Sequence, residues 1–154
     1  MKSRKLMKKN CAGAVLVILT GCYFGANESG GRIIDNFHLI GWDERDWQIV
    51  YSEDNKIYHP EKIIIGHDVF AVGNNDDFII VKQHPCDNPV PHLADFDTLR
   101  PDKEVTNYYI IDIRHGSQSY KLHKFADQEE FDEERRKLGV PMELTYKFYD
   151  AKLD

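Results

Sequence analysis

Apolar residues between residues 32 and 114 recur in short runs separated by polar breaks, which is the pattern of β-strands. In one run Trp47, Ile49 and Tyr51 fall at every second position, so one face of that strand is the drier one. The predicted strands are Phe37–Trp42, Trp47–Tyr51, Ile57–Tyr58, Ile63–Ile65, Asp68–Val72, Phe78–Val81 and Tyr108–Ile113.

The clearest turn is Gly73–Asp77, because Gly, Asn and Asp tolerate the positive φ that tight hairpins need. The outgoing strand Phe78–Val81 has four consecutive apolar residues, which predicts burial on both faces and a central place in the sheet. Its expected partner is Tyr108–Ile113. His84–Lys103 contains four prolines and is predicted to be a long loop, since proline cannot donate to a ladder.

One helix is well specified near the C-terminus. Asp127 is the expected N-cap with Glu130 three residues on, and Gly139 followed by Pro141 ends the helix. Glu143–Tyr149 alternates apolar and polar residues and is expected to form a last strand. The predicted fold class is therefore α+β, a mainly antiparallel β meander with one C-terminal α-helix over about residues 127–138.

The first residues carry an export pattern. Met1–Asn10 holds five cations and no acid, and Ala12–Leu19 is apolar but far shorter than the roughly 20 residues of a membrane span. Leu19-Thr20-Gly21-Cys22 follows and resembles the lipobox of bacterial lipoproteins. That resemblance implies cleavage before Cys22 and a diacylglyceryl group on its sulfur. The expected organisation is a signal peptide at 1–21, a lipidated cysteine and flexible tether at 22–31, and one globular domain at 32–154.

Removing residues 1–21 removes five cations and no acid, so the net charge would fall from −6 to −11. A domain this acidic repels phosphates, which argues against nucleic acid as a partner, and it should stand off an anionic membrane surface. Cys11 would leave with the signal and Cys22 would be lipidated, so Cys86 would be the only thiol. The domain could then form no internal disulfide, and its stability must rest on a hydrophobic core.

Three groups of residues could carry chemistry, and each has a plainer interpretation. His84, Cys86 and His92 are zinc-ligand types without a tight ligand pair, so a surface loop is the favoured interpretation. Cys86 as a nucleophile would need a histidine base and an orienting group. Asp76, Asp77 and Asp87 could bind calcium but lack the EF-hand spacing, and a hairpin turn explains the first two. We therefore expect no metal, no cofactor and no catalytic residue.

Two larger sets of residues also have a plainer interpretation. An acidic run lies on the predicted helix and surrounds most of its circumference, which is typical of a solvated helix. Aromatic residues of the strands could line a groove for a sugar or peptide, although such residues are more often core. The acidic run is Glu129, Glu130, Asp132, Glu133 and Glu134, and the aromatic set is Trp42, Trp47, Tyr51, Tyr58, Tyr108 and Tyr109.

Three stretches occur in a familiar order after the lipobox: Asp77–Pro85 (DFIIVKQHP), Tyr108–Ile113 (YYIIDI) and Glu129–Val140 (EEFDEERRKLGV). In this order they resemble a family of small uncharacterised bacterial lipoproteins that contain a domain of unknown function. The resemblance implies no activity and supplies no functional residues.

These features favour a lipid-anchored, non-enzymatic envelope lipoprotein that binds another protein, for example as an inhibitor or an immunity-type partner. The alternative is a module that binds a small ligand or cell-wall glycan through its aromatic residues. Residue 23 is Tyr, not the Asp of inner-membrane retention, so outer-membrane sorting is expected in a host with two membranes. In a host with one membrane, Cys22 would place the domain on the outer face of the cell membrane.

Overall fold

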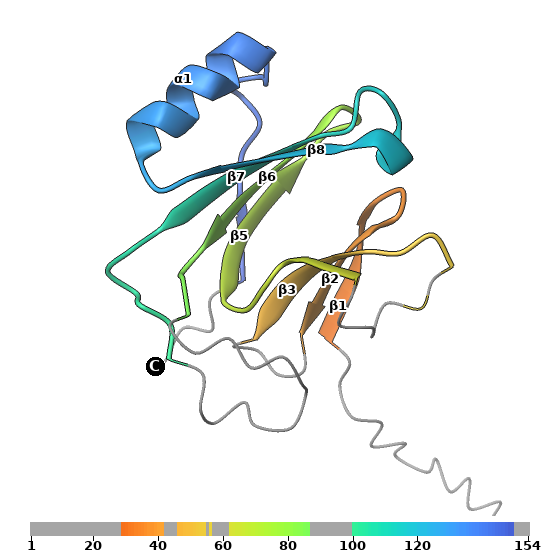
Figure 1. Cartoon of the computed structure of the whole chain (residues 1–154), viewed down its shortest axis with the longest axis horizontal. Coiled ribbons are helices and arrows are strands. Elements are labelled where there is room, and N and C mark those ends of the chain that lie inside the picture. Colours follow the sequence, from red (N-terminus) through yellow and green to blue (C-terminus); the bar gives the residue numbers. More distant parts are fainter. Residues whose placement is uncertain (1–28, 42–45, 55, 57–61, 87–99, 150–154) are drawn as a thin grey trace, which may run out of the picture.

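The chain forms two antiparallel β-sheets and a single long helix, seen in a computed structural model that describes residues 29–41, 46–54, 56, 62–86 and 100–149 (Figure 1). Sheet A has the strand order β1-β2-β3-β4, and sheet B has the order β8-β7-β6-β5-β9. The predicted α+β class is confirmed. The meander continues in chain order through each sheet, and only β9 returns to pair beside β5.

Sheet A contains β1 (Ser29–Ile34), β2 (Phe37–Gly41), β3 (Trp47–Tyr51) and β4 (Ile63–Ile65). Three of these match predicted runs, whereas β1 begins in the segment expected to be tether, three residues before Arg32. A two-residue turn with Asp35 at φ 47° joins β1 to β2, and the partnership of Ile34 with Phe37 closes it. The residues of β1 have little apolar pattern of their own, and they form a strand because they pair with β2.

Sheet B contains β5 (Val69–Asn74), β6 (Phe78–Gln83), β7 (Asn107–Asp112), β8 (Lys121–Phe125) and β9 (Lys147–Phe148). The predicted central strand is confirmed as β6, and its predicted partner is confirmed as β7. The hairpin is also confirmed, but Gly73 and Asn74 belong to β5, so the turn is shorter than expected. The predicted last strand is reduced to two residues, and β8 was not predicted.

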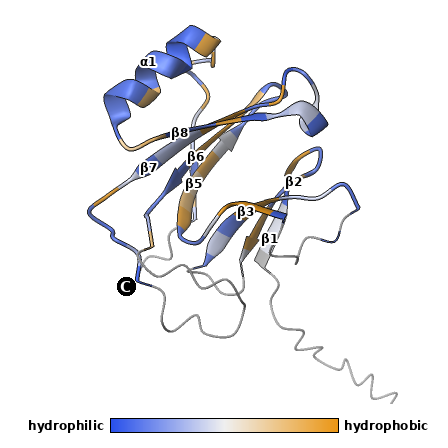
Figure 2. Cartoon of the chain, viewed as in Figure 1, coloured by the Kyte–Doolittle hydropathy of each residue, from blue (hydrophilic) through white to orange (hydrophobic). Residues whose placement is uncertain are grey.

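The helix α1 (Gln128–Leu138) is confirmed together with both of its caps. The Asp127 carboxylate accepts hydrogen bonds from the backbone N–H groups of Glu129 (2.7 Å) and Glu130 (3.1 Å). Gly139 takes the left-handed conformation at φ 77° and ends the helix. Most of the helix surface is hydrophilic, as Figure 2 shows, so the acidic run lies largely in solvent as expected.

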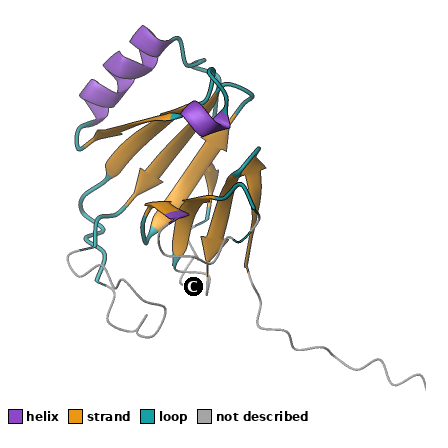
Figure 3. Ribbon diagram, turned by 45° about the vertical axis from the view of Figure 1, so that its right-hand side comes forward, coloured by secondary structure: helices purple, strands orange, loops and turns teal. Residues whose placement is uncertain are grey.

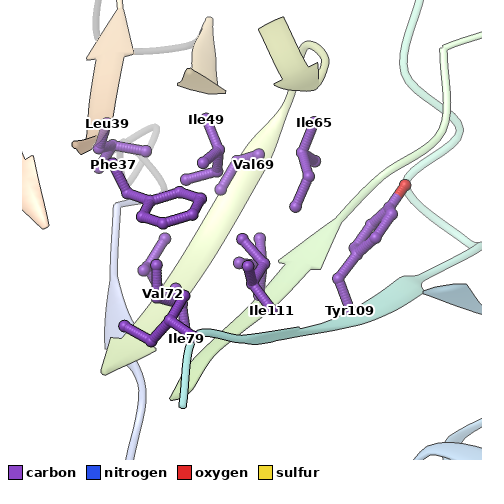
Figure 4. Close-up of a cluster of buried hydrophobic side chains, with 11 residues drawn as sticks. Phe37, Leu39, Ile49, Ile65, Val69, Val72, Ile79, Tyr109 and Ile111 are labelled. Carbon is purple, nitrogen blue, oxygen red and sulfur yellow. The ribbon is translucent and has the colours of Figure 1, made fainter. Parts of the chain in front are cut away.

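Three layers result, because sheet B is buried on both faces (Figure 3). The core between the sheets includes Phe37, Ile49, Ile79 and Ile111, whose side chains meet in Figure 4. The core on the other face of sheet B joins Ile80 and Ile110 to Phe131 of the helix, which is 1% exposed. No helix among the described residues is long and apolar enough to cross a membrane.

Candidate functional site

A groove lies between the two sheets, is lined by residues of both edge strands β1 and β9, and has a volume of about 390 Å³. We call it the edge groove. Within the described part of the chain, β1 pairs only with β2 and β9 pairs only with β5, so each strand leaves one side of its backbone unpaired. The edge groove is lined by Gly30, Gly31, Arg32, Ile33, Leu39, Trp47, Val72, Asn74, Lys147 and Tyr149.

The segment after the helix brings β9 to this groove, and a buried arginine holds the segment in place. Arg135 is 6% exposed, and its Nη2 donates to the carbonyls of Pro141 and Leu144, the latter at 2.9 Å. The segment then passes so close to β5 that a Cβ on Gly73 would lie 2.2 Å from the Thr145 carbonyl oxygen. Only glycine fits there without a shift of backbone, so Gly73 lets the chain reach the edge of sheet B.

Two aromatic rings form the wall of the edge groove. Trp47 of β3 and Tyr149, the residue after β9, lie with ring centroids 5.4 Å apart at an interplanar angle of 58°. Both rings are half-buried and pack against the core between the sheets. The Nζ of Lys147 lies 5.0 Å from the centroid of the Tyr149 ring, a cation–π contact. The wall is thus fixed by the core and presents rings at its open side.

The edge groove carries positive charge, although the chain as a whole is acidic. Among the described residues, its lining holds two exposed cations, Arg32 and Lys147, and no carboxylate, whereas the whole chain has 26 acidic and 20 basic residues. The pKa of the neighbouring His38 is lowered first by burial and second by the positive charge of Arg32. The edge groove is therefore a local cationic site that suits an anionic group.

A second pocket lies around two tyrosines, Tyr51 at the end of β3 and Tyr120 just before β8, and its volume is about 420 Å³. The rings of Tyr51 and Tyr120 lie 5.3 Å apart, and each contacts Phe37 of the core. The Tyr51 hydroxyl donates to Glu53 Oε1 at 2.9 Å. Lys62 hydrogen-bonds to Asp54 and holds the pKa of that carboxyl well below its usual range. We call this site the tyrosine pocket; it is lined by Tyr51, Glu53, Asp54, Lys62, Ile64 and Tyr120.

A buried polar network connects the sheets at the start of β3. Asp46, which is 3% exposed, contacts His67 Nδ1, and Gln48 Nε2 lies 2.8 Å from the same ring nitrogen. Gln83 of β6 donates to the His67 carbonyl at 2.8 Å and accepts from the Tyr109 hydroxyl at 2.5 Å. This carboxylate–histidine pair is of the type a hydrolase would use, but its burial and its links to two strands of sheet B favour a structural role.

The structure does not gather the six predicted aromatic residues into one site. Trp47 lines the edge groove and Tyr51 lines the tyrosine pocket, whereas Tyr109 is 5% exposed in the core. Tyr108 packs on Phe131 of the helix with centroids 5.4 Å apart. Trp42 and Tyr58 lie outside the described residues. The four that are described each lie in or pack against one of the two cores, in line with the favoured interpretation, and they do not line one common groove.

Sequence reasoning missed the tyrosines that complete the two pockets. Tyr149 ends the stretch predicted as the last strand, so alternation placed it on a sheet without showing that it faces Trp47. Tyr120 lies just after η3 (Ser117–Ser119) in a segment for which no element was predicted. Both pairings join residues far apart along the chain, and no local pattern specifies them.

The predicted metal and nucleophile candidates are placed as follows. His84 stacks on Phe70 at 4.2 Å between centroids, and its Nδ1 lies 2.9 Å from the Val105 carbonyl oxygen. Cys86 is half-buried and pairs with Pro101 in an isolated β-bridge. Within the described ranges, no three His, Cys, Asp or Glu residues are grouped to hold a metal ion. His92 and Asp87 lie outside those ranges.

Asp76 and Asp77, the other calcium candidates, lie in the hairpin turn as predicted. The side chain of Asn75 organises this turn by accepting from the backbone N–H groups of Asp77 (3.0 Å) and Phe78 (2.8 Å). The turn thus accounts for both aspartates without a bound ion.

Residues 34–153 match the family model described as "Protein of unknown function (DUF3997)". No curated protein and no solved structure matches the chain significantly. The match covers the whole sandwich except most of β1, and it includes the residues of the edge groove from β2 onward.

Proposed function

The chain belongs to the DUF3997 family of proteins of unknown function, and from that premise we propose that it is a lipid-anchored envelope lipoprotein that binds another protein without catalysing a reaction. The edge groove supports the proposed binding of another protein, because two unpaired strand edges flank a wall of aromatic rings there. Exposed strand edges are templates for pairing with another chain, and aromatic residues are enriched at protein interfaces.

The anchoring half rests on the lipobox-like Leu19–Cys22 and its position relative to the fold. Six residues lie between Cys22 and Ser29, the first residue of β1. The seven Cα-to-Cα steps from Cys22 to Ser29 span at most about 25 Å in an extended chain, so a lipid on Cys22 would hold the start of β1 close to the membrane surface. The edge groove would then face a partner in or near the same membrane: the outer membrane in a host with two membranes, the cell membrane in a host with one.

Replacement of the two cysteines tests the anchoring. Cys22→Ala should move the protein from the membrane fraction to the soluble fraction and abolish labelling by a tagged fatty acid. Cys86→Ala is the matched control and should leave the protein in the membrane fraction, because Cys86 is half-buried in the folded domain. Membrane retention and labelling of Cys22→Ala would refute the anchoring.

Site-specific cross-linking tests the binding. A photoreactive amino acid at position 32 or 149, both in the lining of the edge groove, should cross-link a discrete protein in intact host cells. The same residue at Lys121, on the exposed edge strand β8 at the opposite side of sheet B, should not. If groove and control positions give the same products, or neither gives any, the edge groove is not a protein-binding site.

The tyrosine pocket supports the alternative function, binding of a small ligand or a cell-wall glycan. Two tyrosine rings beside the carboxylates of Glu53 and Asp54 combine stacking surface with hydrogen-bond acceptors, a combination that suits a polyhydroxylated ring. Soluble cell-wall fragments should then raise the melting temperature of the full chain, and Tyr120→Ala should remove that shift. No shift with the unmodified chain would exclude this alternative.

A further inference from the structure

We propose that the edge groove binds an extended, acidic segment of a partner protein, which pairs with β1 and directs its side chains toward Arg32 and Lys147. This inference rests on the protein-binding function proposed above and specifies the chemistry of the partner. It follows from three properties of the groove: its free strand edge, the space above β1, and the sign of its charge.

The strand edge requires an extended occupant. β1 is a six-residue strand at the edge of sheet A, and its residues 30–33 run along the groove. The outer side of such a strand presents alternating N–H and C=O groups, which only another extended backbone can satisfy in series. A compact small molecule would reach one or two of these groups, so the shape of the site favours a peptide segment.

The space above β1 leaves room for side chains of a segment that pairs with its edge. A Cβ on Gly31 would meet nothing within 4 Å, so the middle of the strand is open on the groove side. Glycine inside a strand often marks a place where another backbone or a ligand comes close. The volume of about 390 Å³ is within the size range of ligand sites and accommodates a few side chains against Trp47 and Tyr149.

The charge of the site selects the partner. Arg32 and Lys147 come from opposite sheets and are both exposed, and no carboxylate of a described residue lines the groove beside them. Carboxylates of an incoming segment would therefore find two cations, whereas a basic segment would be repelled by both. Elsewhere the chain is acidic, so this preference is local to the groove and should weaken as salt screens it.

A displayed library of random peptides of about eight residues, slightly longer than a typical strand, tests the inference on the full chain in detergent. Selection should enrich peptides with Asp or Glu at alternating positions. The variant Gly31→Leu fills the groove, and the double variant Arg32→Glu, Lys147→Glu reverses its charge. Each of the two should weaken binding of the selected peptides at least tenfold, which is about 1.4 kcal/mol. Lys121→Glu, the same charge change on the exposed edge strand β8, should leave binding within about twofold.

The outcomes separate the two levels of the proposal. If the selected peptides lose binding on Gly31→Leu but show no excess of Asp or Glu, the preference for an acidic segment is wrong. The proposal that the groove binds a protein would then still hold. If the selected peptides bind both groove variants as tightly as the unmodified chain, or if the library shows no enrichment, the groove is not a peptide-binding site. A circular dichroism spectrum unchanged by Gly31→Leu shows that the loss of binding is not a loss of fold, and the charge-reversal pair provides a second, surface-only test.

Discussion

Among single residues, His38 is the one expected to couple the stability of the fold to pH. It is 8% exposed on β2, its Nε2 has no hydrogen-bond partner among the described residues, and its pKa is lowered from 6.5 by burial and by Arg32. An unfolded histidine keeps its ordinary pKa, so below about pH 6.5 the unfolded state binds more protons than the folded state. Stability should therefore fall as the pH falls through this window, by at most about 1.4 kcal/mol per pH unit for one proton.

Urea unfolding at about pH 7.5 and about pH 5.5 measures this effect. His38→Gln should lose less stability between the two pH values than the unmodified chain. Arg32→Gln should give an intermediate loss, because it removes only the second cause of the lowered pKa. Other groups titrate in the same range, so the comparison between variants is decisive. Equal losses in all three proteins would show that His38 does not couple folding to pH.

Two glycines differ in what surrounds them, although both lie in strands. A Cβ on Gly73 would meet the Thr145 backbone, whereas a Cβ on Gly31 would meet nothing within 4 Å. Gly73→Ala should therefore lower the free energy of unfolding by about 1–3 kcal/mol through overpacking. Gly31→Ala should change it by no more than about 0.5 kcal/mol. Urea denaturation of both variants gives the comparison, and equal effects would contradict the close approach at Gly73.

The helix and the segment that follows it are joined by one buried side chain. Arg135→Met keeps much of the apolar stem but removes the charged hydrogen bonds to the Pro141 and Leu144 carbonyls. We expect a loss of about 1.5–3 kcal/mol, the range for hydrogen bonds to charged groups. Arg136→Met, one residue on and exposed, should cost about 0.5 kcal/mol or less. A similar cost for both variants in chemical denaturation would show that Arg135 does not hold this segment.

The elements that the sequence predicted are those whose own side chains specify them. β6 has four consecutive apolar residues, and α1 has its N-cap at Asp127 and its C-terminal glycine at Gly139. The missed strands β1 and β8 lie at sheet edges and carry Gly or Lys in place of apolar alternation, so only the ladder with a neighbour makes them strands. Edge strands are often polar because they must avoid pairing with other chains.

At the scale of the whole molecule, the division into two sheets could not be predicted. β4 ends one sheet and β5 begins the other, with Asp68 at φ 62° where the chain crosses between them. This crossing puts β1 and β9 in different sheets, and the edge groove that both strands line lies between those sheets. Sheet B is then shared by two cores, one against sheet A and one against α1. A shared middle layer predicts that all three layers unfold together.

Phe131→Ala tests this cooperativity, because Phe131 is 1% exposed in the core between sheet B and the helix. Its loss should cost about 3–5 kcal/mol. The helix signal in circular dichroism and the tryptophan fluorescence, to which Trp47 in sheet A contributes, should shift to lower urea by the same amount. Phe148→Ala, at a ring that is 64% exposed, should shift both curves little. If Phe131→Ala unfolds the helix before the fluorescence changes, the layers are independent, and β9 could leave the edge groove while sheet A stays folded.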